Sequence, residues 1–225
     1  MFISFEGPEG AGKSTQAGLL AVALEQAGWS PCRVREPGGT PIGDRLRPLL
    51  LTSGECPVDA RAEALLYAAA RAQLVADVVE PALREGRIVL SDRYADSTLA
   101  YQGYGRGIPL ADLRAVLQFA TGGRWPDLTI LLDLPVELGL GRKRAQGDDG
   151  AEWTRFEAET LAFHERVREG YRALAAADPE RWVVLDARRA PADLHQDIWQ
   201  AVSARLAEPP DPRAPASRKP ITGSP

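Results

Sequence analysis

The sequence has little of what several protein classes depend on. It contains two cysteines in 225 residues, Cys32 and Cys56, which form no C-x-x-C motif and have no histidine close by. Both thiols are therefore expected to be reduced and structural, as is usual for a cytoplasmic protein. No apolar run approaches the ~18 residues that a membrane-spanning helix requires. The sequence thus predicts neither a disulfide framework nor a membrane span.

An excess of positive charge is also missing. The formal net charge is −4 at pH 7, so bulk attraction to nucleic acid or to an anionic membrane is not expected, although local basic clusters can exist. The N-terminal residues MFISFEG lack the basic segment of a secretory signal peptide. We therefore expect a cytoplasmic protein without a nucleic-acid or membrane partner.

Short apolar runs alternate along the chain with longer stretches of helical periodicity. This alternation predicts an α/β fold with a parallel sheet covered by helices on both faces. The predicted strands are Phe2–Phe5, Arg33–Glu36, Ile88–Ser91, Thr129–Asp133 and Trp182–Leu185. The predicted helices are Lys13–Ala27, Asp59–Arg84, Leu110–Ala120, Val136–Ala145, Arg155–Ala177 and Ala192–Leu206.

The length fits one domain with a small lid. We place the domain at residues 1–207 and expect a mobile lid around residues 142–155. The polar stretch Ala145–Ala151 interrupts the helical pattern with glycines and is expected to be mobile. Residues 208–225 are rich in Pro, Ser and Arg, and are predicted to form a disordered tail because they cannot bury enough apolar surface to offset the entropy of ordering. His164 and His195 lie in helical patterns and are expected at the surface.

The stretch GPEGAGKST matches the phosphate-loop motif G-x-x-x-x-G-K-[ST] without a mismatch, between a predicted strand and a predicted helix. Glycines let backbone N–H groups turn around an anion, and the helix N-terminus adds a positive end. Lys13 supplies a charge for the β- and γ-phosphates, and the Ser14 hydroxyl is placed to ligate Mg²⁺. The context argues against a chance glycine-rich turn. The predicted nucleotide-binding residues are Gly7, Pro8, Glu9, Gly10, Ala11, Gly12, Lys13, Ser14 and Thr15.

A second dense stretch, SDRYADSTLAYQGYGRGI, begins where an apolar strand ends. The Asp92 carboxylate can there face Mg²⁺, and the planar guanidinium of Arg93 can bridge donor and acceptor phosphates. A helix-capping Asp followed by a solvated Arg would look the same in isolation. The phosphate loop favours the catalytic interpretation.

A third stretch, LLYAAARAQLV, places Tyr67 and Arg71 four residues apart on one helix face. The ring can stack on a planar base while the guanidinium donates to an oxygen on its edge. A core tyrosine beside a surface arginine is the alternative, and spacing alone favours it.

Five stretches together resemble the bacterial thymidylate (dTMP) kinases over residues 1–206: FEGPEGAGKST, REPGGTPIGDRLR, LLYAAARAQLV, SDRYADSTLAYQGYGRGI and PDLTILLDLPVELGL. The elements EPGGT and DRY…S-T-x-A-Y-Q-G are specific to that family, whereas the phosphate loop is not. The resemblance implies a three-layer P-loop kinase fold with a five-stranded parallel sheet. It also implies ATP as phosphoryl donor, Mg²⁺ as cofactor and a homodimer.

The resemblance implies a role for each matching residue. Glu9 would accept from the deoxyribose 3′-OH, while Arg47 and Arg93 would bind the dTMP phosphate. Tyr67 stands where the family usually has a Phe stacked on thymine, and Arg71 matches the Arg that donates to thymine O4. Cytosine carries an amino donor at that position, so it would leave two donors facing each other, at a cost of about 1–3 kcal/mol.

Further residues of the acceptor site follow from the same match. Thr98 and Gln102 match polar residues near the N3 edge of the base, and Ser97 belongs with them as substrate-binding. Tyr101 matches the aromatic that packs on the sugar and leaves no room for a 2′-OH. Glu36 opens the EPGGT loop, which in the family shapes the acceptor pocket.

A basic cluster follows the fourth predicted strand: Arg142, Lys143 and Arg144, with Arg155 further on. A solvated basic helix end would explain this position but not the adjacent glycine-containing break. Because the phosphate loop carries Gly10 where one subgroup has an arginine, the chain resembles the subgroup with catalytic arginines in its lid. Its candidates are Arg142, Arg144 and Arg155.

One residue departs from the family pattern in the lid. Thr154 stands where the family often has an Asp, and Asp148 and Asp149 are candidates to replace it.

The predicted reaction is in-line phosphoryl transfer from MgATP to dTMP, which gives dTDP for dTTP synthesis. The acceptor phosphate is mostly a dianion at pH 7, so no general base is required. Another P-loop kinase acting on a deoxynucleoside, with Glu36 as base, or on a different nucleoside monophosphate is the nearest alternative. An NTP-hydrolysing switch is a further one, although the short chain and the acceptor motifs disfavour it.

Overall fold

The computed structural model describes residues 1–52, 58–147 and 154–207. Three predicted features lie outside these ranges. They are the tail, Cys56, and residues 148–151 of the mobile break, which include Asp148 and Asp149. Cys32, in the edge strand β2, is a free thiol. Within the described residues, no helix has the length and apolar character needed to cross a membrane.

The predicted five-stranded parallel sheet is confirmed, with strand order β2-β3-β1-β4-β5. The three inner strands are almost wholly buried, whereas the edge strands β2 and β5 are partly exposed. Continuous apolar runs suit strands that are covered on both faces. The strands are β1 (Phe2–Glu6), β2 (Pro31–Arg35), β3 (Ile88–Asp92), β4 (Leu128–Asp133) and β5 (Trp182–Asp186).

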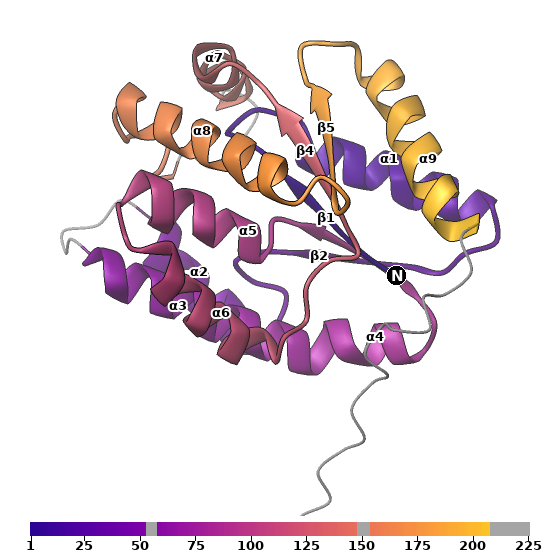
Figure 1. The fold of residues 1–225 in the computed structure, drawn as a ribbon, viewed down its shortest axis with the longest axis horizontal. Helices are drawn as coiled ribbons and strands as arrows, with labels where there is room; N and C mark the ends of the chain where they lie inside the picture. The colour runs from indigo at the N-terminus through magenta and orange to yellow at the C-terminus, as the bar shows by residue number, and fades with distance from the viewer. Residues whose placement is uncertain (53–57, 148–153, 208–225) are drawn as a thin grey trace, which may run out of the picture.

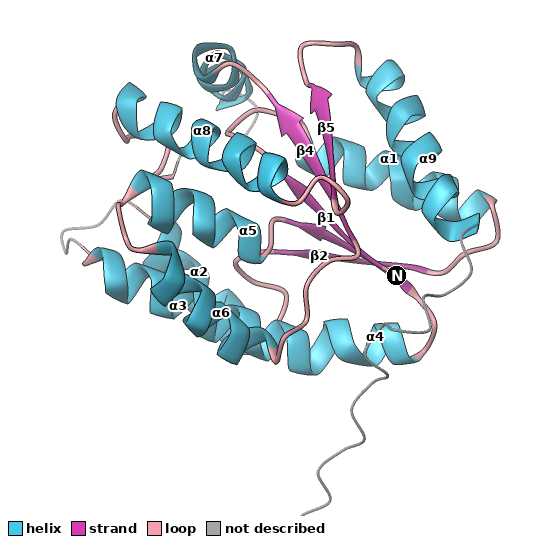
Figure 2. Ribbon diagram, in the orientation of Figure 1, coloured by secondary structure: helices cyan, strands magenta, loops and turns pink. Residues whose placement is uncertain are grey.

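Two helical layers enclose the sheet, as Figure 1 and Figure 2 show. Helices α1 (Lys13–Gln26) and α9 (Pro191–Ala207) cover one face, and a group that includes α3 (Ala60–Leu74) and α8 (Leu161–Ala177) covers the other. Successive strand residues serve opposite cores: Phe2 packs with the second group of helices, and Ile3 packs with α1 and α9. The period of two along a strand produces this division.

The single helix predicted at Asp59–Arg84 consists of three consecutive segments. They are α3 (Ala60–Leu74), the π-helical η1 (Val75–Val79) and α4 (Glu80–Arg84). Pro81 lacks an N–H and would crowd the carbonyl one turn earlier in a regular α-helix. The wider π turn, in which the Glu80 N–H bonds to the Val75 carbonyl, accommodates it.

Three elements were not predicted: α2 (Pro41–Leu51), α5 (Ala95–Thr98) and the π-helical η2 (Leu99–Gly105). For α2 the sequence held a usable signal, because Thr40 caps the helix through Gly43 N–H and Pro41 occupies the first turn. The glycines of η2 disfavour a helix on propensity alone. Tertiary packing requires them, since a Cβ on Gly105 would lie 2.6 Å from the Phe163 ring.

The predicted start of the helix at Arg155 is wrong, because α8 spans Leu161–Ala177 and its N-cap is Thr160. The Arg155 N–H instead bonds to Leu51 O in a turn. His164 is buried in α8 rather than exposed, because it lies on the face of the helix that packs on the rest of the domain. The remaining helices, α6 (Leu110–Thr121) and α7 (Val136–Gly147), lie close to their predicted bounds.

Candidate active site

A cavity opens at the carboxyl ends of β1, β2 and β3, and the phosphate loop forms one wall. Most of the residues predicted to bind nucleotides line it together, from segments spread over more than half of the chain. The lining consists of residues 9–15, 35–37, 47, 51, 67, 71, 92, 93, 97, 98, 101, 102, 143, 154, 156 and 157.

The phosphate loop requires glycine for close packing. Gly7 and Gly10 have positive φ values of 140° and 68°, and a Cβ at either position would lie within 2.4 Å of a backbone oxygen. For Gly10 that oxygen belongs to Gly139 in α7, so an arginine at this position would collide with the helix. The Lys13 ammonium donates to Gly7 O (3.1 Å) and Pro8 O (2.9 Å), and burial, with Arg93 adding to the effect, lowers its pKa to about 8.

Two oxygen-bearing side chains meet beside the loop. The Ser14 hydroxyl, on the second residue of α1, donates to the Asp92 carboxylate at the end of β3. Hard oxygen ligands of this kind suit Mg²⁺, which takes few protein ligands and otherwise binds water and phosphate oxygens. The pair fits the predicted metal position.

Arg93 lies at the centre of the site. Its backbone has a φ of +70°, a conformation uncommon outside glycine, and the Ser91 hydroxyl bonds to its carbonyl. Its guanidinium donates to two residues of the phosphate loop, Gly7 O (3.2 Å) and Glu9 Oε1 (2.9 Å), and to the Tyr101 hydroxyl (3.0 Å) of η2. Arg93 therefore joins the phosphate loop to η2.

Glu9 is held as an anion in this arrangement. Its Oε1 also accepts from the Tyr101 hydroxyl at 2.6 Å. Burial alone would raise the pKa of Glu9, but the charges of Arg93 and Lys13 lower it to about 2. The carboxylate is thus an acceptor at any physiological pH.

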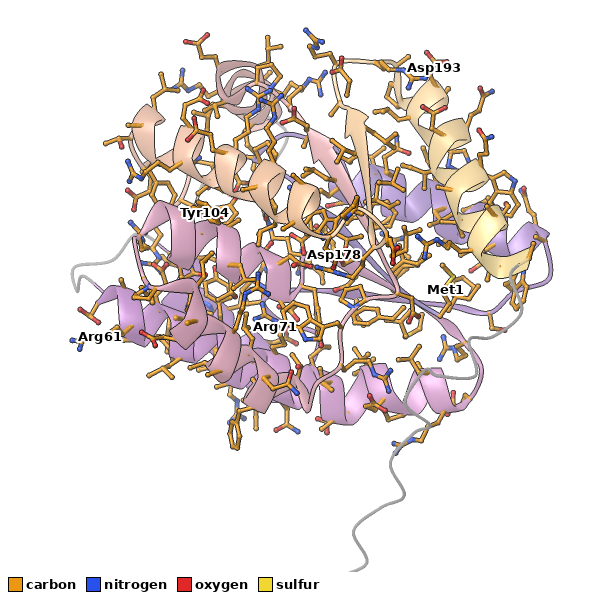
Figure 3. The ribbon with its side chains drawn as sticks, viewed as in Figure 1. Met1, Arg61, Arg71, Tyr104, Asp178 and Asp193 are labelled. Carbon is orange, nitrogen blue, oxygen red and sulfur yellow. The ribbon has the colours of Figure 1, made fainter. Side chains whose placement is uncertain are left out.

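Arg71 is not the surface arginine of the alternative interpretation. Figure 3 labels it in the interior, whereas Arg61 of the same helix lies at the outer edge. Its Nε and Nη2 donate to the Glu36 carboxylate (2.8 and 2.5 Å), and both side chains are buried. Further bonds run from Nη1 to Thr98 Oγ1 (3.0 Å) and from Nη2 to Tyr94 O (3.1 Å). Although burial opposes it, the Glu36 charge raises the pKa of Arg71 above its ordinary value.

Four of the five guanidinium N–H groups of Arg71 are accounted for by these bonds. Glu36 opens the loop predicted to shape the acceptor pocket, and it also fixes the orientation of the predicted base-reading arginine. No sequence pattern linked the two residues, which lie 35 positions apart.

Three aromatic rings close the acceptor end. Tyr101 meets the ring of Phe156 edge-on at 5.6 Å between centroids, and Tyr67 lies 6.4 Å from the same ring. Gln102 donates to the fully buried Glu63 at 2.6 Å. The Arg47 guanidinium bonds to Pro37 O at 2.7 Å on the cavity wall.

The predicted lid arginines lie elsewhere. Arg142 is exposed and donates to Ala187 O (3.0 Å), and Arg144 is also exposed. Arg155 forms an ion pair with Glu63 (2.7 Å). Among the described lining residues the lid contributes Lys143 instead, which lies 3.5 Å from Glu157 Oε1.

The reason is helical register. A Cβ on Gly139 would lie 2.2 Å from Glu9 O, so this face of α7 rests on the phosphate loop. Lys143 lies four residues later on the same face, whereas its two neighbours point elsewhere. Counting one helical turn from Gly139 selects Lys143 only when the contact between Gly139 and the phosphate loop is already known.

Sequence reasoning also missed other lining residues. Thr154, named only as a departure from the family pattern, bonds through its N–H to Glu157 (2.8 Å), and its hydroxyl contacts the same carboxylate. Lys143 had been named only as a member of the basic cluster and Pro37 only within the EPGGT loop. The lining residues that received no predicted role are Arg35, Pro37, Leu51, Lys143, Thr154, Phe156 and Glu157. For Phe156 and Glu157 the adjacent Arg155 was the available signal.

Comparison with known proteins gives a consistent result. The family model described as thymidylate kinase matches residues 5–198. A protein named thymidylate kinase from Thermomicrobium roseum is 54% identical over 202 residues, covering 90% of this chain and 94% of that protein. Another of that name, from Herpetosiphon aurantiacus, is 50% identical and covers 92% and 96%. The crystal structure of thymidylate kinase from Ehrlichia chaffeensis superposes with a TM-score of 0.71 at 29% identity, covering 90% of this chain and 98% of that one.

Proposed function

The chain belongs to the thymidylate kinase family, and we propose how its cavity carries out the reaction of that family, the transfer of a phosphoryl group from ATP to dTMP. The observation that carries the proposal is the position of Arg93. Its guanidinium reaches from the phosphate loop, where it bonds to Gly7 O and the Glu9 carboxylate, to the Tyr101 hydroxyl of η2. A fixed planar cation between two phosphate sites lowers the repulsion between two polyanions that must approach in line.

The donor half of the site consists of the phosphate loop. Backbone N–H groups of residues 9–15 and the N-terminus of α1 would surround the β- and γ-phosphates. The Lys13 ammonium, now bonded to two loop carbonyls, lies within the loop and can turn toward those phosphates. Ser14 and Asp92 would hold Mg²⁺, which supplies positive charge beside the transferring group when bound.

The acceptor half receives dTMP. Arg47 and Arg93 would bind its phosphate, whose oxygen is the nucleophile and needs no general base because it is already ionised. The Glu9 carboxylate would accept from the 3′-OH, and the Tyr101 ring would pack against the sugar. Lys13, Arg93 and the metal together offset the charge that builds up during transfer.

Base recognition follows from the aromatic and Arg71 clusters. Tyr67 and Phe156 present ring faces and edges at the acceptor end, where a pyrimidine ring can stack. The fifth N–H of Arg71 would donate to thymine O4, and Ser97, Thr98 and Gln102, which line the same cavity, would supply polar groups around the base. Because the ion pair with Glu36 holds the guanidinium still, the donor cannot turn away from a cytosine amino group.

For the lid we propose Lys143 as the cation nearest to the transferring group. Arg142, Arg144 and Arg155 remain candidates, and a movement of α7 would have to carry the first two to the cavity. Lys143 already lines the cavity. Lid closure would exclude water and so limit ATP hydrolysis.

The decisive experiment is a coupled ADP-release assay with MgATP and a panel of acceptors: dTMP, dUMP, dCMP, UMP, thymidine and none. Fast release with dTMP, weaker release with dUMP and little with the others is the expected result. Release with thymidine but not with dTMP would instead identify a deoxynucleoside kinase. Release that needs no acceptor would identify an NTP-hydrolysing switch.

We also propose a homodimer and a cytoplasmic location. Supporting the dimer, three neighbouring helices carry exposed apolar side chains: Leu49 on α2, Leu65 on α3 and Phe119 on α6, the last 91% exposed. Such a patch suits an interface with another protein surface. Sedimentation equilibrium tests this directly, and a monomer mass at micromolar concentration would contradict the dimer.

A further inference from the structure

A buried carboxylate lies beneath the site and has no part in the reaction described above. Glu6 ends β1, directly before the phosphate loop, and is fully buried. Its Oε1 accepts the backbone N–H of Tyr94 (2.8 Å). Its Oε2 accepts from the Ser97 hydroxyl (2.6 Å) and the Tyr171 hydroxyl (3.0 Å).

The same two hydroxyl groups contact Arg93. Arg93 Nη1 donates to Ser97 Oγ (3.3 Å) and to the Tyr171 hydroxyl oxygen (3.1 Å). A guanidinium can only donate, so each hydroxyl oxygen must turn its proton away from Arg93. The two hydroxyl groups also bond to each other (2.8 Å), so one of them can donate to the other, and at least one proton goes to the Glu6 carboxylate.

Arg93 depends on such neighbours. Its positive φ is costly for a residue with a side chain and persists where surrounding contacts determine it. Nη2 is held by Glu9 and Tyr101, which also serve the acceptor. Nη1 is held by Gly7 O, Ser97 and Tyr171, and Tyr171 reaches it from α8 without lining the cavity.

We propose that Glu6 and Tyr171 are positioning residues for phosphoryl transfer: the Glu6 carboxylate orients the hydroxyls of Ser97 and Tyr171, whose lone pairs then hold Arg93 between the donor and acceptor phosphates. Neither residue touches a substrate in this arrangement. The inference rests on the role given to Arg93 in the proposed function. It explains why a carboxylate is retained at a fully buried position, where an unpaired charge is expensive.

The cost of that burial is visible in the acid–base properties of Glu6. Burial, with Asp96 adding to the effect, raises its pKa to about 7, although bonds from Ser97 and Tyr94 and the charge of Arg93 oppose the rise. Assays at pH 8 therefore compare variants with an enzyme whose Glu6 is ionised.

The test variant is Tyr171→Phe, which removes only the hydroxyl group. Its matched control is Tyr94→Phe, another fully buried tyrosine, whose hydroxyl donates to Arg124 O (3.1 Å) away from the site. Only the backbone of Tyr94 meets Glu6, and the control leaves it intact. We expect Tyr171→Phe to lower kcat/KM for dTMP about tenfold or more, with KM for ATP changed less than about twofold. We expect Tyr94→Phe to leave both kcat/KM for dTMP and KM for ATP within about twofold of the wild type.

A double-mutant cycle separates positioning from general stability. If Tyr171 acts through Arg93, then Tyr171→Phe has little further effect on kcat in an Arg93→Ala background. Losses of kcat that are fully additive in this cycle would overturn the inference. It would also be overturned if Tyr171→Phe and Tyr94→Phe lost the same activity and that loss followed the fall in their melting temperatures. The wild-type enzyme is assayed beside these variants. If the wild type itself showed no dTMP-dependent ADP release, that result would count against the proposed function and not against the role of Glu6 and Tyr171.

Glu6→Gln tests the orientation of the protons. An amide places an N–H where the carboxylate accepted, so it opposes either the Tyr94 N–H or the two hydroxyl groups. We expect a loss of kcat at least as large as in Tyr171→Phe, measured on protein whose circular dichroism matches the wild type. Unchanged kcat in this folded variant would also overturn the inference.

Discussion

Arg71 is the residue on which base choice depends, and its buried ion pair with Glu36 makes that role testable. The double variant Glu36→Gln/Arg71→Gln removes both charges, so neither is left buried without its partner. Glutamine can accept as well as donate, so the preference for a base with an acceptor at position 4 is lost. We expect the ratio of kcat/KM for dTMP over dCMP to fall about tenfold or more.

The single variant Glu36→Gln, which keeps the Arg71 donor, serves as the control for this prediction. It should keep part of the preference for dTMP and lose less of it than the double variant, because the glutamine oxygen still accepts from Arg71 although the ion pair that holds the guanidinium is lost. A double variant with the wild-type ratio would show that Arg71 does not read the base.

Glu9 links the site to acid stability. Its pKa is lowered from 4.5 to about 2, so its ionisation stabilises the folded state above pH 4.5, and that contribution is lost as the pH falls from 4.5 toward 2. Between pH 6 and pH 3, the wild type should lose about 2 kcal/mol more free energy of unfolding than Glu9→Gln does. Urea titrations at both pH values measure this difference.

An exposed carboxylate on the first helix provides the comparison for Glu9. Glu25→Gln should show nearly the same pH dependence as the wild type. If Glu9→Gln and Glu25→Gln respond to acid alike, the ion pair between Glu9 and Arg93 does not stabilise the folded state.

At the scale of elements, α7 determines which lid cation meets the phosphates. Gly139 places this helix directly on the phosphate loop, and Lys143 follows it by one turn. We expect Lys143→Ala to lower kcat about a hundredfold and Arg142→Ala to lower it much less, because charge stabilisation requires proximity to the transferring group. Single-turnover kinetics with saturating MgATP and dTMP measure the chemical step.

Lys143→Arg is the conservative variant for this test, since it keeps the charge on the same helix face. It should restore a large part of kcat. The opposite order, with Arg142→Ala the more damaging substitution, would mean that α7 rotates or shifts when the lid closes.

The elements η1 and η2 show how packing overrides local preference. Both are π-helical segments, and η2 carries Tyr101 and Gln102, which line the cavity. The wide turn of η1 accommodates Pro81, and the packing of Gly105 on Phe163 leaves no room for a side chain in η2. Segments of this kind are common at functional sites, and η2 supplies two side chains of the acceptor pocket.

At the scale of the whole molecule, the domain boundary predicts the effect of truncation. The last described helix, α9, ends at Ala207, and the composition of residues 208–225 predicts no packed structure. A chain that ends at residue 207 should have the melting temperature and kcat of the full chain, within about 2 °C and about twofold. Calorimetry and the coupled assay measure both.

A loss of more than about 5 °C in that truncated chain would be equivalent to roughly 2 kcal/mol of stability. It would show that the C-terminal residues pack on the domain. The same truncation in a Phe119→Lys chain would then test whether the loss of melting temperature depends on the proposed dimer interface on α6.

The sequence by itself determined the phosphate loop, the five parallel strands and the acceptor motifs around Arg93. These features are local: a glycine-rich loop needs nine consecutive residues, and a buried strand needs one short apolar run. The resemblance of five stretches to a known family added a substrate and a role for each matched residue.

Only the tertiary structure decided which side chains hold those residues in place. The pairs Arg71–Glu36, Glu6–Tyr171 and Arg155–Glu63 join segments 35, 165 and 92 positions apart, and no local pattern encodes such contacts. The choice of Lys143 over its two neighbours depends on the face that α7 presents to the loop. Burial and side-chain pairing arise when distant segments pack, because the partner of a polar group is set by what surrounds it in space.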